Sequence, residues 1–352
     1  MNYEATSSNL DQFLEKMLKK TFTWQDAYKF LQFQSDDSWD PFFENVYEKF
    51  SLPKRKEKNI KVYVPGREFP SISLTGKACA LNCEHCDRKY LSSMIPAATS
   101  SQLKTVLANL SKSGKVGTLL SGGCDAEGKV NYSNFVQVIQ DFKQTPEGKK
   151  FYLNSHVGLV STSEAQELAK IGIDAVSFDL NLDSEVITNI FHLKHSPEDY
   201  QNSFEALLNN GINVIPHILI GANFGRIKGE LTALKYLNRF QPEIIVFIVM
   251  IPPRRQGVMD SRFSLVSPQE VAKIILISHY FFPHAEISLG CMRPYWNDAF
   301  HTEKWAIQAG VSRMVKPTMK TRQWLENESF KIEKLTACCV IPYEMENVAK
   351  KD

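Results

Sequence analysis

The stretch GKACALNCEHC, residues 76–86, carries three cysteines at C-x3-C-x2-C spacing: Cys79, Cys83 and Cys86. A short apolar run at residues 71–74 precedes it directly. Thiolates are soft ligands that suit iron–sulfur clusters or zinc, and three of them on one tight loop can hold three irons of a cubane cluster. The fourth iron then stays open for an external ligand. We therefore expect a metal centre on this loop, at the end of a strand.

Short apolar runs alternate with helical segments from this loop onward, for example the helical residues 163–170, 229–238 and 268–282. Repeated βα units imply parallel strands with right-handed crossovers, and up to eight units over about 250 residues is the size of a full barrel. We predict an α/β fold with a (β/α)8 TIM-type barrel; an open doubly wound sheet is the alternative. The predicted strands are residues 71–74, 116–120, 151–154, 175–180, 214–220, 244–251, 285–289 and 311–315.

Reactive side chains follow these runs closely. Cys79 follows the first run, Cys124 the second, His156 the third and Cys291 the seventh, while DLNLDS at residues 179–184 ends the fourth. Chemistry in a barrel lies at the C-terminal ends of the strands. The placement predicts one shared site at the barrel mouth.

We divide the chain into a helical N-terminal extension and linker (1–60), the barrel (61–317) and a C-terminal segment (318–352) that carries cysteines and closes over the mouth. Helical spacing of apolar residues, a cap at Thr23 and the pair Asp40–Pro41 predict three N-terminal helices. We expect these helices to close the bottom of the main domain rather than to serve as a binding arm. PKRKEK, residues 53–58, is expected to be a solvated linker.

Composition excludes several classes of protein. The 352 residues include 41 Lys and Arg against 39 Asp and Glu, a balance of +2, which disfavours a nucleic-acid binder. The most apolar run, residues 244–251, has eight residues, whereas a membrane-spanning helix needs roughly 20. The first residues lack the features of a signal peptide. We expect a cytoplasmic protein with no nucleic-acid or membrane partner, in which spaced cysteines are ligands rather than disulfides.

The cysteine spacing resembles the signature of the radical S-adenosylmethionine (radical SAM) superfamily. That resemblance implies a 4Fe–4S cluster held by Cys79, Cys83 and Cys86, whose open iron binds SAM and whose electron cleaves it to a 5′-deoxyadenosyl radical. The position before the last cysteine is often aromatic in the superfamily, and here it is His85. The alternative is a zinc site with His85 or His156 as the fourth ligand.

Three further segments resemble SAM-binding elements of the superfamily. Ser-Gly-Gly at residues 121–123 resembles the element that holds the methionine ammonium, although Cys124 stands at its acidic position. NLDS at residues 181–184 resembles an element of biotin synthase that contacts ribose and substrate, and the alternative is a helix cap. LIGANFGRIKGE, residues 219–230, resembles the adenine-side loop. The cofactor-binding residues implied are His85, Gly122, Gly123, Asp179, Asn181, Asp183, Gly221 and Asn223.

Four cysteines remain outside the triad, and four are enough for a second cluster. Cys338 and Cys339 are adjacent, and neighbouring side chains of an extended chain point to opposite faces. We expect one of the two to be a ligand, or both only where the backbone bends sharply. Arg293 is a candidate neighbour of this cluster, and four unrelated buried cysteines are the alternative. The predicted ligands of the auxiliary cluster are Cys124, Cys291, Cys338 and Cys339.

A second cluster at a barrel mouth suggests a sulfur donor. The segments LLSGGCDAEGKV, HVGLV, VIPHILIGANFGRIKGE and LGCMRP and the tail CC resemble biotin-synthase-related proteins over about residues 66–340. More narrowly, they resemble one subunit of the two-protein lipoyl synthase. The resemblance implies sulfur insertion into an octanoyl group on a lipoyl carrier protein, together with a second radical SAM subunit and an electron donor such as ferredoxin or flavodoxin. It does not assign this chain to C6 or C8.

Two other functions stay open on the sequence. One is a radical SAM enzyme of another class, such as small-molecule methylation or rearrangement, in which a second cluster binds substrate or relays electrons. The other is a zinc-stabilised scaffold. The single-chain lipoyl synthase carries its auxiliary cysteines in a compact N-terminal motif, whereas the first cysteine here is Cys79. The auxiliary ligands must therefore come from the barrel and the tail.

Overall fold

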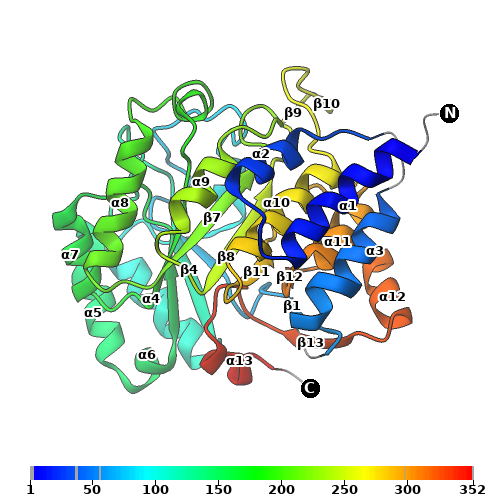
Figure 1. Ribbon diagram of the computed structural model, residues 1–352. Coiled ribbons are helices and arrows are strands. Elements are labelled where there is room, and N and C mark those ends of the chain that lie inside the picture. Colours follow the sequence, from blue (N-terminus) through cyan, green and yellow to red (C-terminus); the bar gives the residue numbers. More distant parts are fainter. Residues whose placement is uncertain (1–3, 36–38, 55–56, 297, 351–352) are drawn as a thin grey trace.

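The computed structural model describes residues 4–35, 39–54, 57–296 and 298–350. Residues 55 and 56 of the predicted linker lie outside these ranges. Figure 1 shows a curled sheet with helices around its outer side and with the N-terminal helices along one flank.

Within the described residues, eleven strands form one sheet in the order β13-β1-β12-β11-β8-β7-β6-β5-β4-β2-β3, and every pairing in it is parallel. From β2 to β12 the spatial order follows the chain order, except that β3 pairs with the outer edge of β2. A doubly wound sheet reverses its order at a switch point, so that alternative is excluded. The strands are β1 (Asn59–Tyr63), β2 (Ser71–Ser73), β3 (Ile95–Pro96), β4 (Gly117–Ser121), β5 (Tyr152–Ser155), β6 (Ala175–Asp179), β7 (Val214–Ile220), β8 (Ile244–Val249), β11 (Glu286–Leu289), β12 (Arg313–Val315) and β13 (Lys331–Leu335).

The sheet curls into a half-barrel. Tyr63 of β1, Tyr152 of β5, Ile215 of β7 and Val315 of β12 belong to one buried apolar cluster although they come from strands across the sheet. Only a sheet that bends around a common interior brings such side chains together. The predicted TIM-type α/β class is confirmed, and all eight predicted strands are present within a few residues of their expected bounds.

Strands β1 and β13 were not predicted. β1 pairs with both β12 and β13 in parallel. Their sequences, NIKVY and KIEKL, carry charges in place of a continuous apolar run. Lys61 of β1 bonds Glu286 and Glu346 at 2.8 and 2.9 Å. Paired charges thus occupy positions where the apolar pattern of a buried parallel strand is expected.

Helices connect the strands on the outer side of the sheet (Figure 1). A small antiparallel hairpin, β9 (Arg254–Arg255) and β10 (Val258–Met259), follows β8. The helices of the barrel and tail are α4 (Ser100–Lys112), α5 (Val136–Gln144), α6 (Pro146–Lys150), α7 (Thr162–Lys170), α8 (Pro197–Asn209), α9 (Glu230–Leu237), α10 (Pro268–Phe281), α11 (Ala299–Ala309), α12 (Met319–Asn327) and α13 (Tyr343–Ala349).

The N-terminal helices are α1 (Glu4–Leu18), α2 (Trp24–Gln32) and α3 (Asp40–Val46). On the outer side of the barrel α2 packs against α10, α3 packs against α11, and α1 packs against α3. This position differs from the expected closure of the bottom. Thr23 caps α2 as predicted. Asp40 does not cap α3: it is the first residue of the helix, and its carboxylate accepts hydrogen bonds from Trp305 and Lys304 of α11, both at 2.8 Å.

The C-terminal tail enters the barrel from below. Ala337, Val340 and Ile341 are buried in the same cluster as Tyr152 and Ala175, the first residues of β5 and β6. These apolar side chains fill the end where the strands begin, so the placement differs from the expected closure over the mouth. In Figure 1, α13 accordingly lies at the opposite edge from the β9–β10 hairpin. None of the helices in the described part of the chain combines the length and the hydropathy required to cross a membrane.

Candidate functional site at the barrel mouth

The cysteine triad lies on the loop after β2. Cys79, Cys83 and Cys86 are all free thiols and half-buried. The Cys86 amide donates to the Cys83 carbonyl at 3.1 Å, which tightens the loop between them. Burial and the charges of Cys86 and Cys79 raise the pKa of Cys83 to about 12, and burial also raises that of Cys86. A metal ion binds the deprotonated thiolate, so these thiols would release their protons when a metal binds.

The predicted glycine pair packs directly against this loop. The Gly123 amide donates to Thr75 Oγ1 at 2.6 Å, and the Ala80 amide donates to the Cys124 carbonyl at 2.7 Å. A Cβ on Gly123 would lie 2.0 Å from the carbonyl oxygen of Ala78 and 2.5 Å from Cys79 Cβ. No side chain fits there, so glycine permits the backbones of the two segments to touch.

Cys124 lies beside the triad. After burial, the charges of Cys79 and Cys83 are the largest contributions that raise the pKa of Cys124, to about 12. The tail cysteines make no comparable contribution. The structure therefore brings Cys124 to the first cysteine set, whereas the sequence analysis assigned it to the second.

A polar layer crosses the barrel interior on β5, β6 and β7. His156 Nδ1 lies 3.5 Å from Asp179 Oδ2, and the rings of His156 and His217 are 5.5 Å apart. Desolvation inside the barrel opposes the ionisation of Asp179, but the hydrogen bond with His156 and the charges of His156, His217 and His85 together outweigh it and lower the pKa of the carboxyl group. Burial and the neighbouring His156 lower the pKa of His217 to about 4. His156 thus pairs with Asp179. A zinc site on the triad would instead require His156 to face the three cysteines.

His85, the other candidate zinc ligand, is largely enclosed. Its Nδ1 has no hydrogen-bond partner, and its ring lies 5.5 Å from that of Phe191. Burial and the charge of Lys89 lower the pKa of His85 to about 4. A buried ring nitrogen without a partner is expected at a site that a ligand completes.

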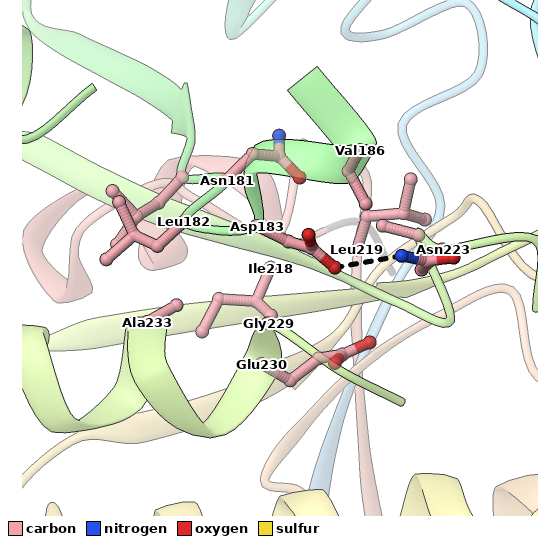
Figure 2. A pocket seen from close by; sticks show the side chains of 12 residues that line it. Asn181, Leu182, Asp183, Val186, Ile218, Leu219, Asn223, Gly229, Glu230 and Ala233 are labelled. Atoms are coloured by element: carbon pink, nitrogen blue, oxygen red, sulfur yellow. Dashed lines mark hydrogen bonds between the residues drawn. The ribbon is translucent and has the colours of Figure 1, made fainter. Parts of the chain in front are cut away.

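The remaining predicted SAM contacts form a separate wall, drawn in Figure 2. Asp183 Oδ2 accepts from Asn223 Nδ2 at 3.0 Å, and its Oδ1 accepts from the Glu185 amide at 2.9 Å. Asp183 therefore also plays the helix-capping role that was the alternative. Asn181 lines the same wall, around a cavity of about 10 Å³, roughly the room of one water molecule.

Asp179 does not belong to this wall, because its carboxylate meets His156. The alternation that suggested one shared face for Asp179, Asn181 and Asp183 ends with β6 at Asp179. Residues 180–183 have left the strand, so the period of two no longer applies to them.

The loop after β7 is held by a buried carboxylate. Glu230 Oε1 accepts from the Gly221 amide at 2.6 Å, and Oε2 accepts from the Lys228 amide at 2.7 Å. Gly221 has φ +77°, and a Cβ there would lie 2.2 Å from Val266 Cγ2. Sequence reasoning missed Glu230, which anchors the glycine turn predicted to approach adenine.

Glu230 predicts a pH dependence of stability. Burial raises its pKa to about 7, whereas an unfolded glutamate titrates near 4.5. Between these values the folded state holds a proton that the unfolded state has lost, so the free energy of unfolding falls as pH rises from 4.5 to 7, at most about 1.4 kcal/mol per unit. Urea unfolding at several pH values should show that Glu230→Gln flattens this slope. The exposed Glu326→Gln is the control, and an unchanged slope in Glu230→Gln would contradict the assignment.

The second cysteine set, Cys291, Cys338 and Cys339, lies close enough together for the charges of its thiols to interact. Cys291 lies just after β11, Cys338 is half-buried and Cys339 is buried. The charge of Cys339 contributes to raising the pKa of Cys291, and the charge of Cys291 contributes to raising the pKa of Cys338. The Ile341 amide donates to the Cys338 carbonyl at 3.3 Å, so the chain turns here. Both adjacent cysteines are expected to serve as ligands only where the backbone bends sharply, and this turn is such a bend. The thiols of Cys338 and Cys339 contact each other.

Two buried arginines fix the segments that carry these cysteines. Arg313 Nη1 donates to the carbonyls of Cys339 and Ile341 at 3.0 and 2.8 Å, while its charge is paired with Glu286 and Glu346. Arg293, fully buried, pairs with Glu303 at 2.6 Å and donates to the carbonyl of Gly290. Its guanidinium is thus committed to Glu303 and to backbone carbonyls. Arg293 positions the Cys291 segment rather than offering a free ligand.

Tyr90 links the two cysteine sets. Burial raises the pKa of its phenol, and the charges of Cys86 from one set and Cys291 from the other contribute further. Both sets therefore lie within electrostatic reach of one side chain. The triad and Cys291 share one end of the barrel, as the shared-site prediction expected.

Iron–sulfur clusters need soft thiolate donors, and both cysteine sets carry such donors. In the part of the chain that is described, no three His, Cys, Asp or Glu side chains converge as ligands of one ion. Ligands of a cubane bind different irons and need not converge on one point. The triad fits a cubane by its three half-buried thiols and by the Gly123 contact that holds their loop. The second set fits through three grouped thiols, and the buried hydroxyl of Tyr152, whose nearest charges include Cys338, has no partner.

Comparison with known proteins gives a family for the central segment. Residues 73–228 match the family model described as the Radical SAM superfamily. No curated protein matches the chain. Among solved structures, the FeFe-hydrogenase maturase HydG from Carboxydothermus hydrogenoformans is 15% identical and covers 94% of this chain and 81% of its own, with a TM-score of 0.65. Another HydG structure is 16% identical, covering 89% and 69%, with a TM-score of 0.64. Methylornithine synthase (PylB) is 16% identical, covering 90% and 96%, with a TM-score of 0.59. These likenesses show the fold.

Proposed function

We propose that this radical SAM enzyme, whose radical SAM domain spans residues 73–228, inserts sulfur into a protein-bound octanoyl group as one of two partner proteins that form lipoyl. The single observation that supports the proposal is that Cys291, Cys338 and Cys339 lie within electrostatic reach of one another in the barrel that carries the triad. A radical SAM domain needs only the triad, the 4Fe–4S cluster and SAM. A second group of thiols supports a second cluster, which would be the sulfur source.

Each cysteine set would hold one cluster. Cys79, Cys83 and Cys86 would hold the cluster that binds SAM, and Cys291, Cys338 and Cys339 the auxiliary one. When bound, the clusters and SAM supply the hydrogen abstraction and the sulfur, while the protein supplies position and exclusion of water. Gly122 and Gly123 would let the methionine end approach the backbone. Asn223, fixed by Asp183, and the turn at Gly221, fixed by Glu230, would face the nucleoside.

The octanoyl substrate and the partners rest on the resemblance to the two-protein lipoyl synthase. We propose as partners a second radical SAM subunit, an octanoylated lipoyl carrier protein and a ferredoxin or flavodoxin as electron donor. Leu119 of β4 and Ile248 of β8 pack against the inner cluster of the barrel and would give an acyl chain an apolar wall. A cytoplasmic location, where thiols stay reduced, suits this proposal.

Iron and sulfide content after anaerobic reconstitution tests the proposal. The wild type should hold about eight irons, and Cys291→Ala and the triple variant Cys79→Ala/Cys83→Ala/Cys86→Ala about four each. Cys291→Ala should still cleave SAM but should transfer no labelled sulfide to an octanoyl-lysyl peptide. About four irons in the wild type would show that the protein holds no auxiliary cluster and would contradict the proposal. SAM cleavage by the wild type without loss of sulfide would favour a radical SAM enzyme of another class.

A further inference from the structure

A layered arrangement sets the His156–Asp179–His217 group in the barrel interior. Tyr152, Ala175 and Ile215, near the starts of β5, β6 and β7, lie in the inner apolar cluster. Side chains two residues apart on a strand share a face. The next layer is Asn154 and Ser177, which bond each other at 2.9 Å.

The layer above it holds the three titratable residues. His156 comes directly after β5, Asp179 ends β6, and the register pairs Asp179 with His217. His156 and Asp179 therefore lie at the C-terminal ends of their strands, where barrel chemistry occurs, and His217 lies level with Asp179 in the middle of β7. Water reaches about half of the Asp179 side chain, which has 55% exposure, and 27% of His156. His217 is half-buried.

Hydrogen-bond partners fix what this group can offer a ligand. His217 Nδ1 lies 3.0 Å from the carbonyl oxygen of Ile215. A carbonyl only accepts, so Nδ1 carries the proton and Nε2 of the neutral ring is an acceptor. His156 Nδ1 lies 3.5 Å from Asp179 Oδ2, so in the neutral ring the Nδ1 proton faces the carboxylate and Nε2 is a second acceptor. Among the described residues, no Lys or Arg forms a salt bridge with Asp179. The atoms that this group can offer to a ligand, the Nε2 atoms of the two neutral histidines and the Asp179 carboxylate, are all hydrogen-bond acceptors.

The group also lies next to the radical SAM loop. The charge of Asp179 contributes upward to the pKa values of Cys124 and His85. The charges of Asp179, Cys124 and Cys83 all contribute to raising the pKa of Tyr200. A ligand bound to His156 and His217 would therefore lie between the triad and the barrel interior. A substrate must occupy this region for hydrogen abstraction near the cluster.

We propose that His156 and His217, with Asp179, bind a hydrogen-bond donor of the substrate. This inference rests on the proposed function, under which the donor is the amide N–H that joins the octanoyl group to its lysine. The acceptors hold that N–H, while the acyl chain lies along the apolar wall of Leu119 and Ile248. A site built to pair with an N–H rejects an analogue that lacks it, because its acceptors are then left unpaired.

The experiment compares two fluorescent peptides by anisotropy on the anaerobically reconstituted protein. One carries octanoyl-lysine, and in the other an ester oxygen replaces the amide nitrogen. The wild type should bind the amide at least about tenfold more tightly. His217→Phe and His156→Phe keep a ring but remove the acceptor, so their preference should fall close to one. His284→Phe, on an exposed loop, should keep the wild-type preference.

Several outcomes would overturn the inference. These are equal binding of the two peptides by the wild type, no binding of either, or a full preference retained in both ring variants. Loss of SAM binding in the variants with the peptide preference intact would assign the group to the cofactor instead. Unchanged iron content and circular dichroism check that the variants are folded. A peptide preference without transfer of labelled sulfide would sink the proposed function and leave the inference standing.

Discussion

Replacing Cys83 by alanine eliminates the reductive cleavage of SAM. Cys83 is the central and most strongly perturbed thiol of the triad, and its Sγ lies 3.8 Å from the carbonyl oxygen of Phe191 on a loop held by Gly123. Under the proposed function Cys79 and Cys86 would each hold an iron of their own, so neither could replace Cys83. Changes in the outer shell of a metal site already cost about 10–100-fold. We expect 5′-deoxyadenosine formation to fall by more than about 100-fold.

The measurement is 5′-deoxyadenosine formation with dithionite as reductant, by chromatography, on protein with assayed iron. Cys291→Ala, which changes the second set, is the matched control and should retain cleavage. Retained cleavage in Cys83→Ala would show that the triad is not the radical SAM site. Loss of cleavage in both variants would show that the two cysteine sets do not act separately.

Replacing Arg293 by methionine destabilises the fold by about 3–5 kcal/mol, the usual cost of removing one partner of a buried ion pair. Arg293 and Glu303 have side-chain exposures of 1% and 0%. Without the guanidinium, Glu303 keeps hydrogen bonds from Thr318 and Thr321 but remains a buried charge without a cation. The carbonyls of Gly290 and Val315 also lose their donor.

Urea unfolding of Arg293→Met, Glu303→Met and the double variant measures this pair. The double variant should be more stable than Arg293→Met alone, because it leaves no uncompensated charge. Lys58→Met, which breaks the exposed pair with Glu328, is the control and should change stability by less than about 1 kcal/mol. A change in Arg293→Met as small as in that control would refute the structural role. A second readout is auxiliary iron, which should fall as the Cys291 segment loosens.

The sequence predicted the barrel well because its strands are continuous apolar runs. Val214–Ile220 was predicted to the residue, since a parallel strand covered on both faces leaves an unbroken signal. β1 and β13 escaped prediction because Lys61 and its neighbours satisfy their charges across the barrel floor. Pairing between residues about 285 positions apart leaves no local pattern.

The site was predictable where chemistry depends on local spacing. The C-x3-C-x2-C loop and the glycine pair lie together as expected. The grouping of residues that are distant in sequence was harder to predict. Cys124 lies beside the triad and not in the second set, and Asp179 pairs with His156 instead of sharing a face with Asp183. His217 was overlooked as a site residue, although its alternation with Ile215 on one strand face was visible in the sequence. Glu230 gave no signal, because a single glutamate at the start of a helix is ordinary.

The tail that fills the barrel floor also sets an order of assembly. Residues 337–341 are synthesised after the strands of the barrel, yet they complete a core that includes side chains from β1, β5 and β6. The triad, by contrast, is synthesised before β3 and every later strand of the sheet. Domains fold as their segments emerge, N-terminal parts first. A nascent chain therefore exposes its first three cysteines long before its interior can close. Truncation or a C-terminal fusion that displaces this short segment would leave the barrel open at its base.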